Sequence, residues 1–351
     1  MQTLTILHVV FSSRLAGGEN HCIDLAQAQA ELGHRVHVAT PSRSALRPLL
    51  GEQVRFHGLA LPFLLRGQRI RRLARQVGAD VVHGHLGPAC KATVWATSAA
   101  RIGTLHLGYK PHQHSRLDGL VCVNAEQAQS LACFAGLHRT INNWAPQRTA
   151  TSRGARCEGL RQTLHIPATA PLVLCTGRLN PIKGMDVLIE AFQRFAPATA
   201  HLVLLGEGPE RSRLAALGAG NARIHLPGFF WNADELLAEA DLYVSASREE
   251  AAPLVLLEAM RANVPIVATN TQGARHLLAG QPAMLIAAGD AAALGRAIET
   301  SLAHAAPQVA TGQRPQVRYT LQHFDRFAAV HDTLALYRDV IVRRFGREVV
   351  A

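Results

Sequence analysis

The stretch YVSASREEAAPLVLLEAMRANVPIVAT, residues 243–269, decides the fold. A short apolar strand over 241–246 ends in a polar turn, and Pro253 then opens an apolar helical run, where the missing N–H of proline is no loss. Asn263 should end this helix, because asparagine tolerates the left-handed conformation found there. A buried strand over 265–268 follows at once. Strand, helix and strand in this order predict an α/β protein with parallel sheets.

Two carboxylates stand at a chemically useful spacing in this stretch. Glu250 lies just before the helix, and Glu258 lies within it, eight residues on. A helix N-terminus presents free N–H groups and partial positive charge, so a carboxylate there can accept from sugar hydroxyls while N–H groups hold other oxygens. A single glutamate in a helix is more often a solvated or capping residue. The pair alone therefore favours an ordinary structural role.

The surrounding residues make the stretch recognisable. It resembles the E-x7-E segment of retaining GT-B glycosyltransferases of the family 4 type, which it matches at Glu250, Pro253, Glu258, Ala259, Met260, Pro265 and Gly273. The family usually has glycine and a large apolar residue after the first glutamate, where this chain has Ala251 and Ala252. His276 stands where the family often has glutamate. The resemblance implies that Glu250 binds donor-sugar hydroxyls, that Glu258 binds the nucleotide ribose, and that Pro253 and Leu254 line the donor site.

The length and composition fit a two-domain enzyme. The 351 residues suffice for two cores, and no apolar run approaches the length of a membrane-spanning helix. The N-terminal MQTLTILHVVF has no basic leader and is typical of a strand rather than a signal peptide. Six cysteines without C-x-x-C spacing predict mostly buried free thiols in a reducing cytosol. We therefore expect a cytoplasmic protein.

The positive charge is concentrated in the first half. Residues 1–150 hold 16 Lys and Arg against 7 Asp and Glu, whereas residues 151–351 hold 20 against 18. This asymmetry predicts that the first half meets an anionic partner.

The first half opens with a strand and a glycine loop. The apolar run over 4–11 predicts a buried strand, and an amphipathic helix over 21–32 follows. Between them, Gly17 and Gly18 can let the backbone approach an oxygen-rich ligand at a helix N-terminus. The loop lacks the G-x-G-x-x-G fingerprint of dinucleotide sites. By resemblance, its Gly-Gly-Glu is the family's loop that faces the donor phosphate and the acceptor.

Histidines mark the ends of two further strands. Strands over 80–85 and 101–107 carry polar residues at their carboxyl ends, where ligands gather in open α/β sheets. His83 and His85 are interpreted as structural, whereas His106 in Thr-Leu-His resembles the active-site histidine of the family. The following segment, 107–116, should be an acceptor-facing loop. Its His112 and His114 could hold a metal ion, but no set of cysteines or carboxylates accompanies them.

The second half begins after a linker predicted over 145–170. A strand over 172–176 leads into the loop GRLNPIKG, residues 177–184, and a helix. Arg178 and Lys183 flank this turn, and two cations at a strand end indicate an anionic ligand. The loop, including Gly177, resembles the family's diphosphate-binding loop. The segment GEGP, which begins at Gly206, also matches the family.

An aromatic pair leaves two alternatives open. Phe229 and Phe230 lie near the place where the family holds the nucleotide base, but they could equally belong to the core.

The resemblance implies a GT-B architecture, in which two Rossmann-like domains with parallel sheets face each other across a cleft. The domains are expected at 1–150, on the acceptor side, and at 165–320, which binds the nucleotide sugar. A C-terminal helix at about 323–351 should pack back on the first domain. The implied activity is retaining transfer of a glycosyl group from a UDP- or GDP-sugar to a glycan or glycolipid acceptor, in bacterial cell-envelope synthesis of the lipopolysaccharide type. No D-x-D sequence occurs, so neither a metal ion nor a cofactor is expected.

Two other functions stay open at this point. Nucleotide-sugar epimerases share the architecture but transfer nothing to an acceptor. A non-catalytic nucleic-acid-binding protein would also have a basic half, although aromatic interleaving and any known module are missing, so nucleic acid is not expected as a partner.

A basic segment suggests contact with a membrane. Residues 66–78 predict a helix whose basic side chains are Arg66, Arg69, Arg71, Arg72 and Arg75, with Ile70, Leu73 and Val77 on the other side. The apolar segment LALPFLL, residues 59–65, comes just before it. Apolar residues beside a basic helix are typical of proteins that rest on anionic lipid, although the apolar residues could instead be core and the arginines a solvated face.

Overall fold

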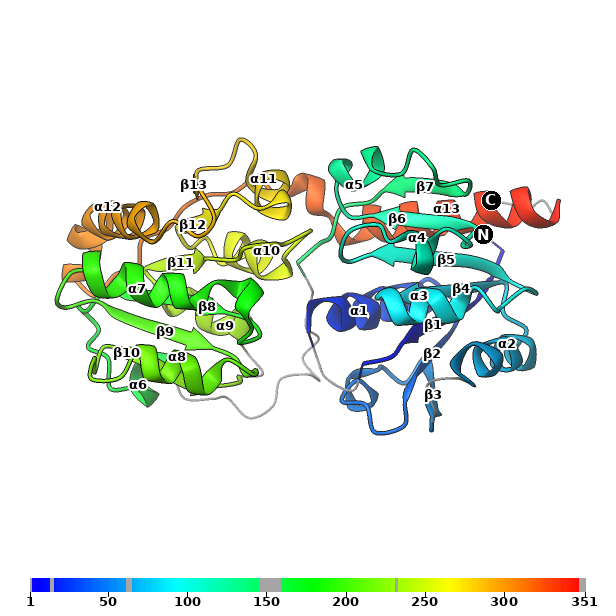
Figure 1. The fold of residues 1–351 in the computed structure, drawn as a ribbon, viewed down its shortest axis with the longest axis horizontal. Coiled ribbons are helices and arrows are strands. Elements are labelled where there is room, and N and C mark those ends of the chain that lie inside the picture. Colours follow the sequence, from blue (N-terminus) through cyan, green and yellow to red (C-terminus); the bar gives the residue numbers. More distant parts are fainter. Residues whose placement is uncertain (1, 13–15, 61–64, 146–158, 231–232, 347–351) are drawn as a thin grey trace. The chain divides into compact units, whose positions relative to one another are not determined.

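The computed structural model describes residues 2–12, 16–60, 65–145, 159–230 and 233–346. The chain forms two compact units, Met1–Gln147 with Phe324–Ala351 and Arg148–His323, and each is described by itself (Figure 1). The domain boundary predicted near residue 150, and much of the predicted linker, fall in residues 146–158, outside the described residues.

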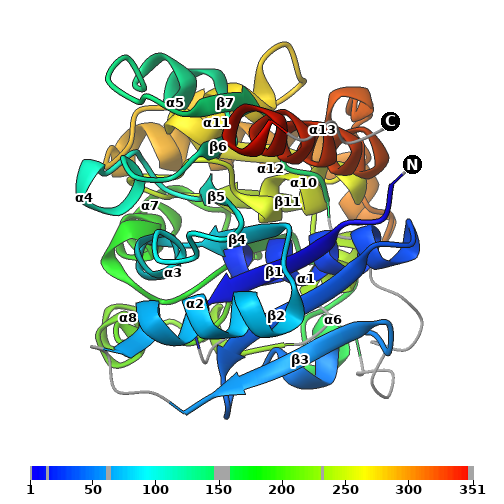
Figure 2. The ribbon, with the colours of Figure 1, turned by 90° about the vertical axis from the view of Figure 1, so that its right-hand side faces the viewer.

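The first unit is built on a parallel sheet. Its strands are β1 Thr5–Val10, β2 Arg35–Pro41, β3 Val54–Leu59, β4 Val81–His85, β5 Ala100–Leu105, β6 Gly119–Cys122 and β7 Leu137–Thr140. They are arranged in the order β3-β2-β1-β4-β5-β6-β7, which can be followed in Figure 2. The first strand lies inside the sheet, and all six of its residues are buried, as the apolar run predicts.

Helices cover both faces of this sheet. They are α1 Gly17–Glu31, α2 Arg66–Val77, α3 Gly87–Thr93, α4 Pro111–His114, α5 Ala125–Gln129 and α13 Arg326–Phe345, with a 3₁₀ turn at Arg47–Leu49. Alternate residues of β1 point to opposite faces. Ile6 packs with residues of α1 and α13, and Leu7 packs with residues of α2 and α3.

The C-terminal helix is part of the first unit. In α13, Leu334, Tyr337 and Val340 are buried in the same core as Ile6 and Ile102. The ion pair between Arg326 and Asp24, 3.2 Å long, ties the start of α13 to α1. The helix therefore covers the sheet that the N-terminal residues form.

The second unit repeats the plan with a shorter sheet. Its strands are β8 Leu172–Thr176, β9 His201–Leu205, β10 Ile224–Gly228, β11 Leu242–Ser245, β12 Ile266–Thr269 and β13 Met284–Ile286, in the order β10-β9-β8-β11-β12-β13. Its helices are α6 Leu160–Thr163, α7 Met185–Phe195, α8 Arg211–Leu217, α9 Ala233–Leu236, α10 Leu254–Arg261, α11 Gln272–Leu278 and α12 Ala291–Ala310. Short 3₁₀ turns occur at Pro181–Lys183, Leu237–Glu239 and Gln322–Phe324. Asn263 follows α10 with a φ of 57°, the left-handed conformation predicted from the sequence.

Several predicted elements differ from the structure. Helix α1 begins at Gly17 rather than residue 21, so the glycines form its first turn instead of a loop before it. The segment 107–116, predicted as a loop, contains the short helix α4, and α3 had no periodic signal because it is only seven residues long. Helix α12 continues through Pro307 to Ala310.

The structure of the basic helix α2 corrects the interpretation that its apolar residues face lipid. Ile70 and Leu73 of α2 are buried in the core with Val9 and Val82, and Val77 packs against the same cluster. The apolar side of this helix therefore cannot face lipid. Its exposed surface carries arginines instead, and residues 61–64 of the preceding apolar segment lie outside the described residues.

Two other expectations can be checked. Cys22, Cys90, Cys122 and Cys175 are buried free thiols, Cys133 is an exposed one, and Cys157 is not among the described residues. Within the described ranges, no helix combines the length and the apolar character that crossing a membrane requires.

Asp241 provides a test of what holds the second unit together. Its fully buried carboxylate accepts from Arg161 at 2.7 Å, Arg314 at 2.6 Å and the backbone N–H of Leu172 at 2.7 Å. We expect Asp241→Asn to lower the free energy of unfolding by about 3–5 kcal/mol, because two largely buried guanidinium groups lose their counter-charge.

Urea denaturation measures the change, and Asp339→Asn is the matched control. Asp339 pairs with Arg139 but has a half-exposed side chain, so its loss should lower the free energy of unfolding by about 0–1 kcal/mol. Equal effects of the two substitutions would contradict the role given to Asp241.

Candidate active site

The strand order of each sheet reverses beside its first strand. The reversal lies between β8 and β11 in the second unit and between β1 and β4 in the first. Ligands of open α/β sheets bind at such points, beyond the carboxyl ends of the strands. The predicted donor residues follow this rule: Gly177, Arg178 and Lys183 come after β8, Gly206 after β9, and Glu250, Pro253, Leu254 and Glu258 after β11. Gly17 and Gly18 come after β1, and His106 after β5.

Lys183 and Glu250 form an ion pair across the reversal in the second unit. Both side chains are mostly buried, and the Ser247 hydroxyl donates to the same carboxylate at 3.3 Å. The backbone oxygen of Glu250 accepts from the N–H of Gly273, at 2.7 Å. Two residues that the sequence assigned separately to phosphate and to sugar are therefore held in contact.

Arg248 locks the two loops together. Its guanidinium donates two hydrogen bonds of 3.0 Å to the Asp186 carboxylate at the start of α7. Its backbone N–H donates to the backbone oxygen of Ile182 at 2.7 Å. The sequence assigned no function to Arg248, because nothing in the local pattern shows a partner 62 residues away. Such a fork-to-carboxylate bond holds Lys183 and Glu250 at a fixed separation.

Two glycines allow the loops to touch. Gly184 has a φ of 61°, and a Cβ there would lie 2.0 Å from the Ala246 oxygen. Gly206 has a φ of 146°, and a Cβ there would lie 1.8 Å from the Gly177 oxygen. Any other residue would push apart the loops after β8, β9 and β11.

The remaining donor candidates line the same edge. Arg178 is exposed, whereas Pro253 and Leu254 are buried at the start of α10. Burial, with a smaller contribution from neighbouring charges that include Glu258, raises the pKa of Tyr243. The Tyr243 hydroxyl lies 3.3 Å from Thr176 Oγ1 at the end of β8.

For Phe229, the structure excludes one of the two alternatives, a place in the core. Its side chain is 48 % exposed, so it is not a core residue, and it follows β10 directly.

In the first unit, the glycines meet the active-site histidine candidate. A Cβ on Gly18 would lie 3.5 Å from His106 Cγ and 3.0 Å from Leu86 Cδ2. The first turn of α1, with its free N–H groups, therefore adjoins His106. Among the predicted site residues, the structure thus brings together Gly18 and His106 in one unit, and Gly177, Lys183, Gly206 and Glu250 in the other.

His106 is the outer end of a buried hydrogen-bonded chain that the sequence did not reveal. His106 Nε2 lies 3.3 Å from His85 Nδ1, His85 Nε2 lies 3.0 Å from His8 Nδ1, and His8 Nε2 lies 2.8 Å from Gln29 Oε1. The chain continues from the Gln29 amide through the Tyr337 hydroxyl to His83 and Thr104. His85, which we interpreted as structural, therefore touches the predicted active-site residue.

This chain fixes the proton positions. The Gln29 oxygen can only accept, so His8 Nε2 donates to it, and His8 Nδ1 must accept from His85 Nε2. In neutral rings, His85 Nδ1 then accepts from His106 Nε2. His106 consequently presents an unprotonated Nδ1 away from the chain.

Burial keeps these rings neutral. It lowers the pKa of both His8 and His106 to about 4, and it also lowers the pKa values of His21, His83 and His85 well below their ordinary range. At pH 7, His106 can accept a hydrogen bond from a ligand through Nδ1, but the ring carries no positive charge.

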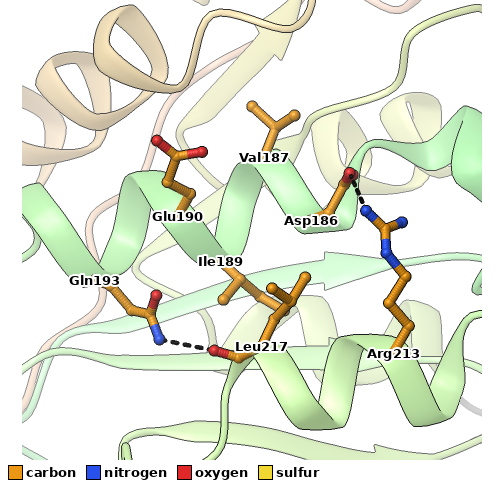
Figure 3. A pocket seen from close by; sticks show the side chains of 7 residues that line it. All are labelled: Asp186, Val187, Ile189, Glu190, Gln193, Arg213 and Leu217. Atoms are coloured by element: carbon orange, nitrogen blue, oxygen red, sulfur yellow. Dashed lines mark hydrogen bonds and ion pairs between the residues drawn. The ribbon is translucent and has the colours of Figure 1, made fainter.

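A depression between α7 and α8 is not the site. It is lined by Asp186, Val187, Ile189, Glu190, Gln193, Arg213 and Leu217 (Figure 3). None of the predicted site residues, all of which the structure describes, lines it. It lacks the converging polar groups that a substrate site requires, because Asp186 and Arg213 are paired with each other there.

The metal alternative at His112 and His114 gains no support. His114 uses its Nδ1 to accept from the Lys110 N–H at 3.0 Å. Among the described residues, the groups with metal-ligand spacing are His8, Cys22 and His85, and His21, His85 and His106.

Both halves of the chain match known families. Residues 15–158 match the family described as Glycosyltransferase Family 4, and residues 170–304 match the family described as Glycosyl transferases group 1. The lipopolysaccharide core biosynthesis glycosyltransferase LpsE of Rhizobium meliloti (strain 1021) is 29 % identical over 302 residues, which is 82 % of this chain and 86 % of that protein. The phosphatidyl-myo-inositol mannosyltransferase of Mycobacterium leprae (strain TN) is 27 % identical over 317 residues, 82 % of this chain and 84 % of that protein.

The folds also agree with a solved structure. HepE of Anabaena, in complex with UDP-glucose, superimposes with a TM-score of 0.76 at 21 % identity, covering 95 % of this chain and 99 % of that one. The two parallel-sheet units are therefore those of the GT-B fold.

The neutral histidines predict a dependence of stability on pH. The pKa of His8 is about 4 in the folded protein and about 6.5 in the unfolded chain, so the unfolded state binds more protons between these values. The free energy of unfolding should be greatest above pH 6.5 and should fall towards pH 4, by about 1.4 kcal/mol per pH unit for each such ring.

Urea denaturation of the wild type and His8→Asn between pH 7.5 and 4.5 isolates the contribution of one ring. For His8→Asn, the free energy of unfolding should fall less steeply with decreasing pH, by about 1.4 kcal/mol per pH unit. His138→Asn, at an exposed position, is the control for removing a histidine. Identical slopes for His8→Asn and the wild type would show that this ring is not held neutral.

Proposed function

The chain belongs to the family 4 type of GT-B glycosyltransferases, and on that basis we propose that it transfers a sugar from a nucleotide-sugar donor to an acceptor hydroxyl with retention of anomeric configuration. The observation that carries this proposal is the contact between Lys183 and Glu250. In a nucleotide sugar the phosphate is bonded directly to the sugar, so a ligand that meets both side chains must present phosphate oxygens and hydroxyls side by side. The sequence analysis assigned Lys183 to the diphosphate and Glu250 to the donor sugar, and a nucleotide sugar presents both groups in this way.

The same residues can assist departure of the nucleotide. Lys183 and the exposed Arg178 stabilise the negative charge that grows on the diphosphate as the glycosidic bond breaks. Glu250 holds sugar hydroxyls, and Glu258 holds the ribose. The family resemblance assigns His106, which is neutral and has a free Nδ1, to the reacting sugar. A phosphate oxygen of the leaving group takes the proton of the attacking hydroxyl on the same face.

The relatives support the donor and acceptor classes. HepE binds UDP-glucose, LpsE is named for lipopolysaccharide core biosynthesis, and the mycobacterial mannosyltransferase is named for a phosphatidylinositol acceptor. We propose a UDP- or GDP-sugar as donor, and as acceptor an anionic glycolipid of the lipopolysaccharide type in bacterial cell-envelope synthesis. The excess of basic residues in 1–150 suits such an acceptor.

A product assay tests the reaction class. UDP-glucose and GDP-mannose are each incubated with the protein, with and without a phosphorylated lipopolysaccharide-type acceptor, and NMR identifies the anomeric configuration of the product. Acceptor-dependent transfer with retention is expected. An inverted product, or an epimer of the donor formed without acceptor, would overturn the proposal.

The phosphate-binding role predicts a large loss of activity. Arg178→Ala and Lys183→Ala should each lower kcat/KM. The loss should correspond to about 2–4 kcal/mol of transition-state stabilisation, as for removal of an oxyanion donor. Steady-state kinetics with saturating acceptor measure the loss. Arg194→Ala removes an exposed cation of the same unit, which pairs with Glu190 one turn earlier and lies over the Phe195 ring, and should leave kcat/KM unchanged. Wild-type values for both Arg178→Ala and Lys183→Ala would refute the assignment.

We also propose that the first unit docks on an anionic membrane surface, on its cytoplasmic side, through the basic face of α2. Arg69, Arg71, Arg72 and Arg75 of α2 are exposed, and α2 contains no acidic residue. Each basic residue near anionic lipid contributes about 1 kcal/mol. Since Ile70 and Leu73 are buried in the core, no apolar insertion by α2 accompanies this attraction.

Co-sedimentation measures the docking. Arg69, Arg72 and Arg75 changed together to Glu should weaken binding to phosphatidylglycerol vesicles at least about 100-fold, since about 3 kcal/mol of attraction is lost. High salt should release the wild type, and phosphatidylcholine vesicles should not bind it. The matched control changes the exposed Arg43, Arg55 and Arg116 of the same unit to Glu. If both triple variants lose binding equally, the surface is not α2.

A further inference from the structure

Three imidazoles converge beside the first turn of α1. They belong to His21 of α1, His85 at the end of β4 and His106 after β5, and their candidate ligand nitrogens all lie within 4.8 Å of one another. The ring centroids of His21 and His106 are 5.1 Å apart, and those of His85 and His106 are 5.5 Å apart. Three separate elements thus deliver one imidazole each to the same point.

His21 carries a polar atom without a partner. Its side chain is only 5 % exposed, and its Nδ1 is buried with no hydrogen-bond partner in the described structure. Leaving such a group unpaired costs about 1–3 kcal/mol, so a buried unpaired nitrogen calls for an explanation. Its neighbours are the two other imidazoles and Trp144, whose ring centroid lies 4.8 Å away and whose N–H is engaged by Asp24.

The spacing of the nitrogens suits a small transition-metal ion. Ligand nitrogens at about 2.0 Å from Zn²⁺ stand about 3.3 Å apart in a tetrahedron. His85 Nδ1 and His106 Nε2 are 3.3 Å apart. Three imidazoles with the fourth position open to water or substrate form a common zinc ligand set.

We propose that His21, His85 and His106 form a binding site for one divalent transition cation of the Zn²⁺ class, and that the bound ion inhibits the enzyme. The ion replaces the hydrogen bond between His85 and His106, and the proton moves from His106 Nε2 to its Nδ1. His106 then loses the free Nδ1 that it presents to the sugar. This inhibitory effect rests on the proposed function, whereas the metal site itself does not.

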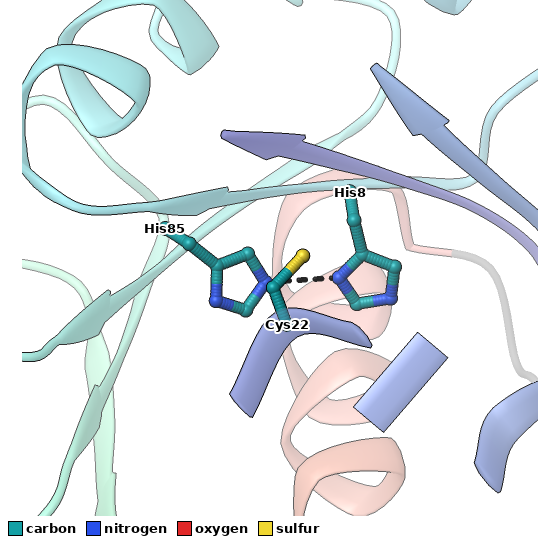
Figure 4. A group of neighbouring side chains, drawn as sticks. All are labelled: His8, Cys22 and His85. Carbon is teal, nitrogen blue, oxygen red and sulfur yellow. Dashed lines mark hydrogen bonds between the residues drawn. The ribbon is translucent and has the colours of Figure 1, made fainter. Parts of the chain in front are cut away.

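The ion can reach this site but not the adjoining one. His106 is only partly buried, so the three-imidazole group opens to solvent at one ligand. In the adjoining group, the His8 and His85 rings are bonded to each other with the Cys22 thiol beside them (Figure 4). All three of these side chains are fully buried, so no ligand of this group is open to solvent.

Direct binding is the primary test. Metal-free protein is titrated with Co²⁺, whose visible absorption reports tetrahedral coordination, and Zn²⁺ is added in competition. One equivalent should bind, and His21→Phe, which preserves the aromatic packing, should weaken Zn²⁺ binding by at least about 100-fold. His106→Asn, at the more exposed position, should have the same effect, so the test does not depend on one variant folding.

Two control variants separate this site from other metal-binding groups. His57→Phe removes one ring of the pair formed with His37, in which the nitrogens are 2.8 Å apart, and Cys22→Ala removes the thiol of the adjoining group. Neither should change the Co²⁺ spectrum. A spectrum unaffected by His21→Phe and His106→Asn, or abolished by either control, would overturn the proposed site.

The inhibitory role has a separate readout. Zn²⁺ at saturating concentration should reduce wild-type transfer at least about tenfold, and the degree of inhibition, relative to its own metal-free rate, should be lost in His21→Phe. A Zn²⁺-saturated wild type that transfers sugar at the metal-free rate would overturn the inhibitory role. If no donor supports transfer at all, the proposed function fails, while the Co²⁺ titration still decides the metal site.

Discussion

The reversal of strand order beside the first strand of each sheet is the constraint on which the candidate sites depend. Connections between parallel strands are right-handed, so the chain leaves β8 towards β9 on one side and returns to β11 on the other. The loops after these two strands therefore diverge to opposite sides of the same edge and leave room between them for a ligand. Lys183 and Glu250 lie on these two loops, although 67 residues separate them. In the first unit, the same reversal places α1 and the end of β4 together.

The donor site that we propose would hold phosphate and sugar in adjacent positions, which requires loops in fixed positions. The structure achieves this with backbone contacts that exclude a Cβ at Gly184 and Gly206, and with the fork of Arg248 on Asp186. The ion pair between Lys183 and Glu250 has a further consequence. Each side chain neutralises the other in the absence of ligand. When a donor binds, Lys183 exchanges Glu250 for the phosphate, and Glu250 exchanges Lys183 for the sugar hydroxyls. This limits the desolvation cost of binding.

The sequence predicted elements and local motifs better than it predicted contacts between distant residues. The strand at Leu172–Thr176 and the start of the next helix at Met185 agree with the prediction, because glycine and proline delimit buried apolar runs there. Amphipathicity of α2 did not reveal what its apolar side faces, and Ile70 and Leu73 proved to be core residues. The sequence also could not reveal the hydrogen bonds of His85, which was interpreted as structural: His8 lies on another strand, His106 follows a third, and no local pattern links them.

The C-terminal helix illustrates how such distant contacts reach the candidate reaction centre. Tyr337 of α13 accepts from the Gln29 amide, which orients the Gln29 oxygen towards His8. The orientation of that amide sets the proton on His8, and each ring then sets the next as far as His106. Reversing the order of the protons would leave His8 Nε2 without a proton opposite the Gln29 oxygen, a buried contact in which neither atom could then donate. A helix that begins 326 residues into the chain thereby determines which nitrogen of His106 is free to accept, without touching His106 itself.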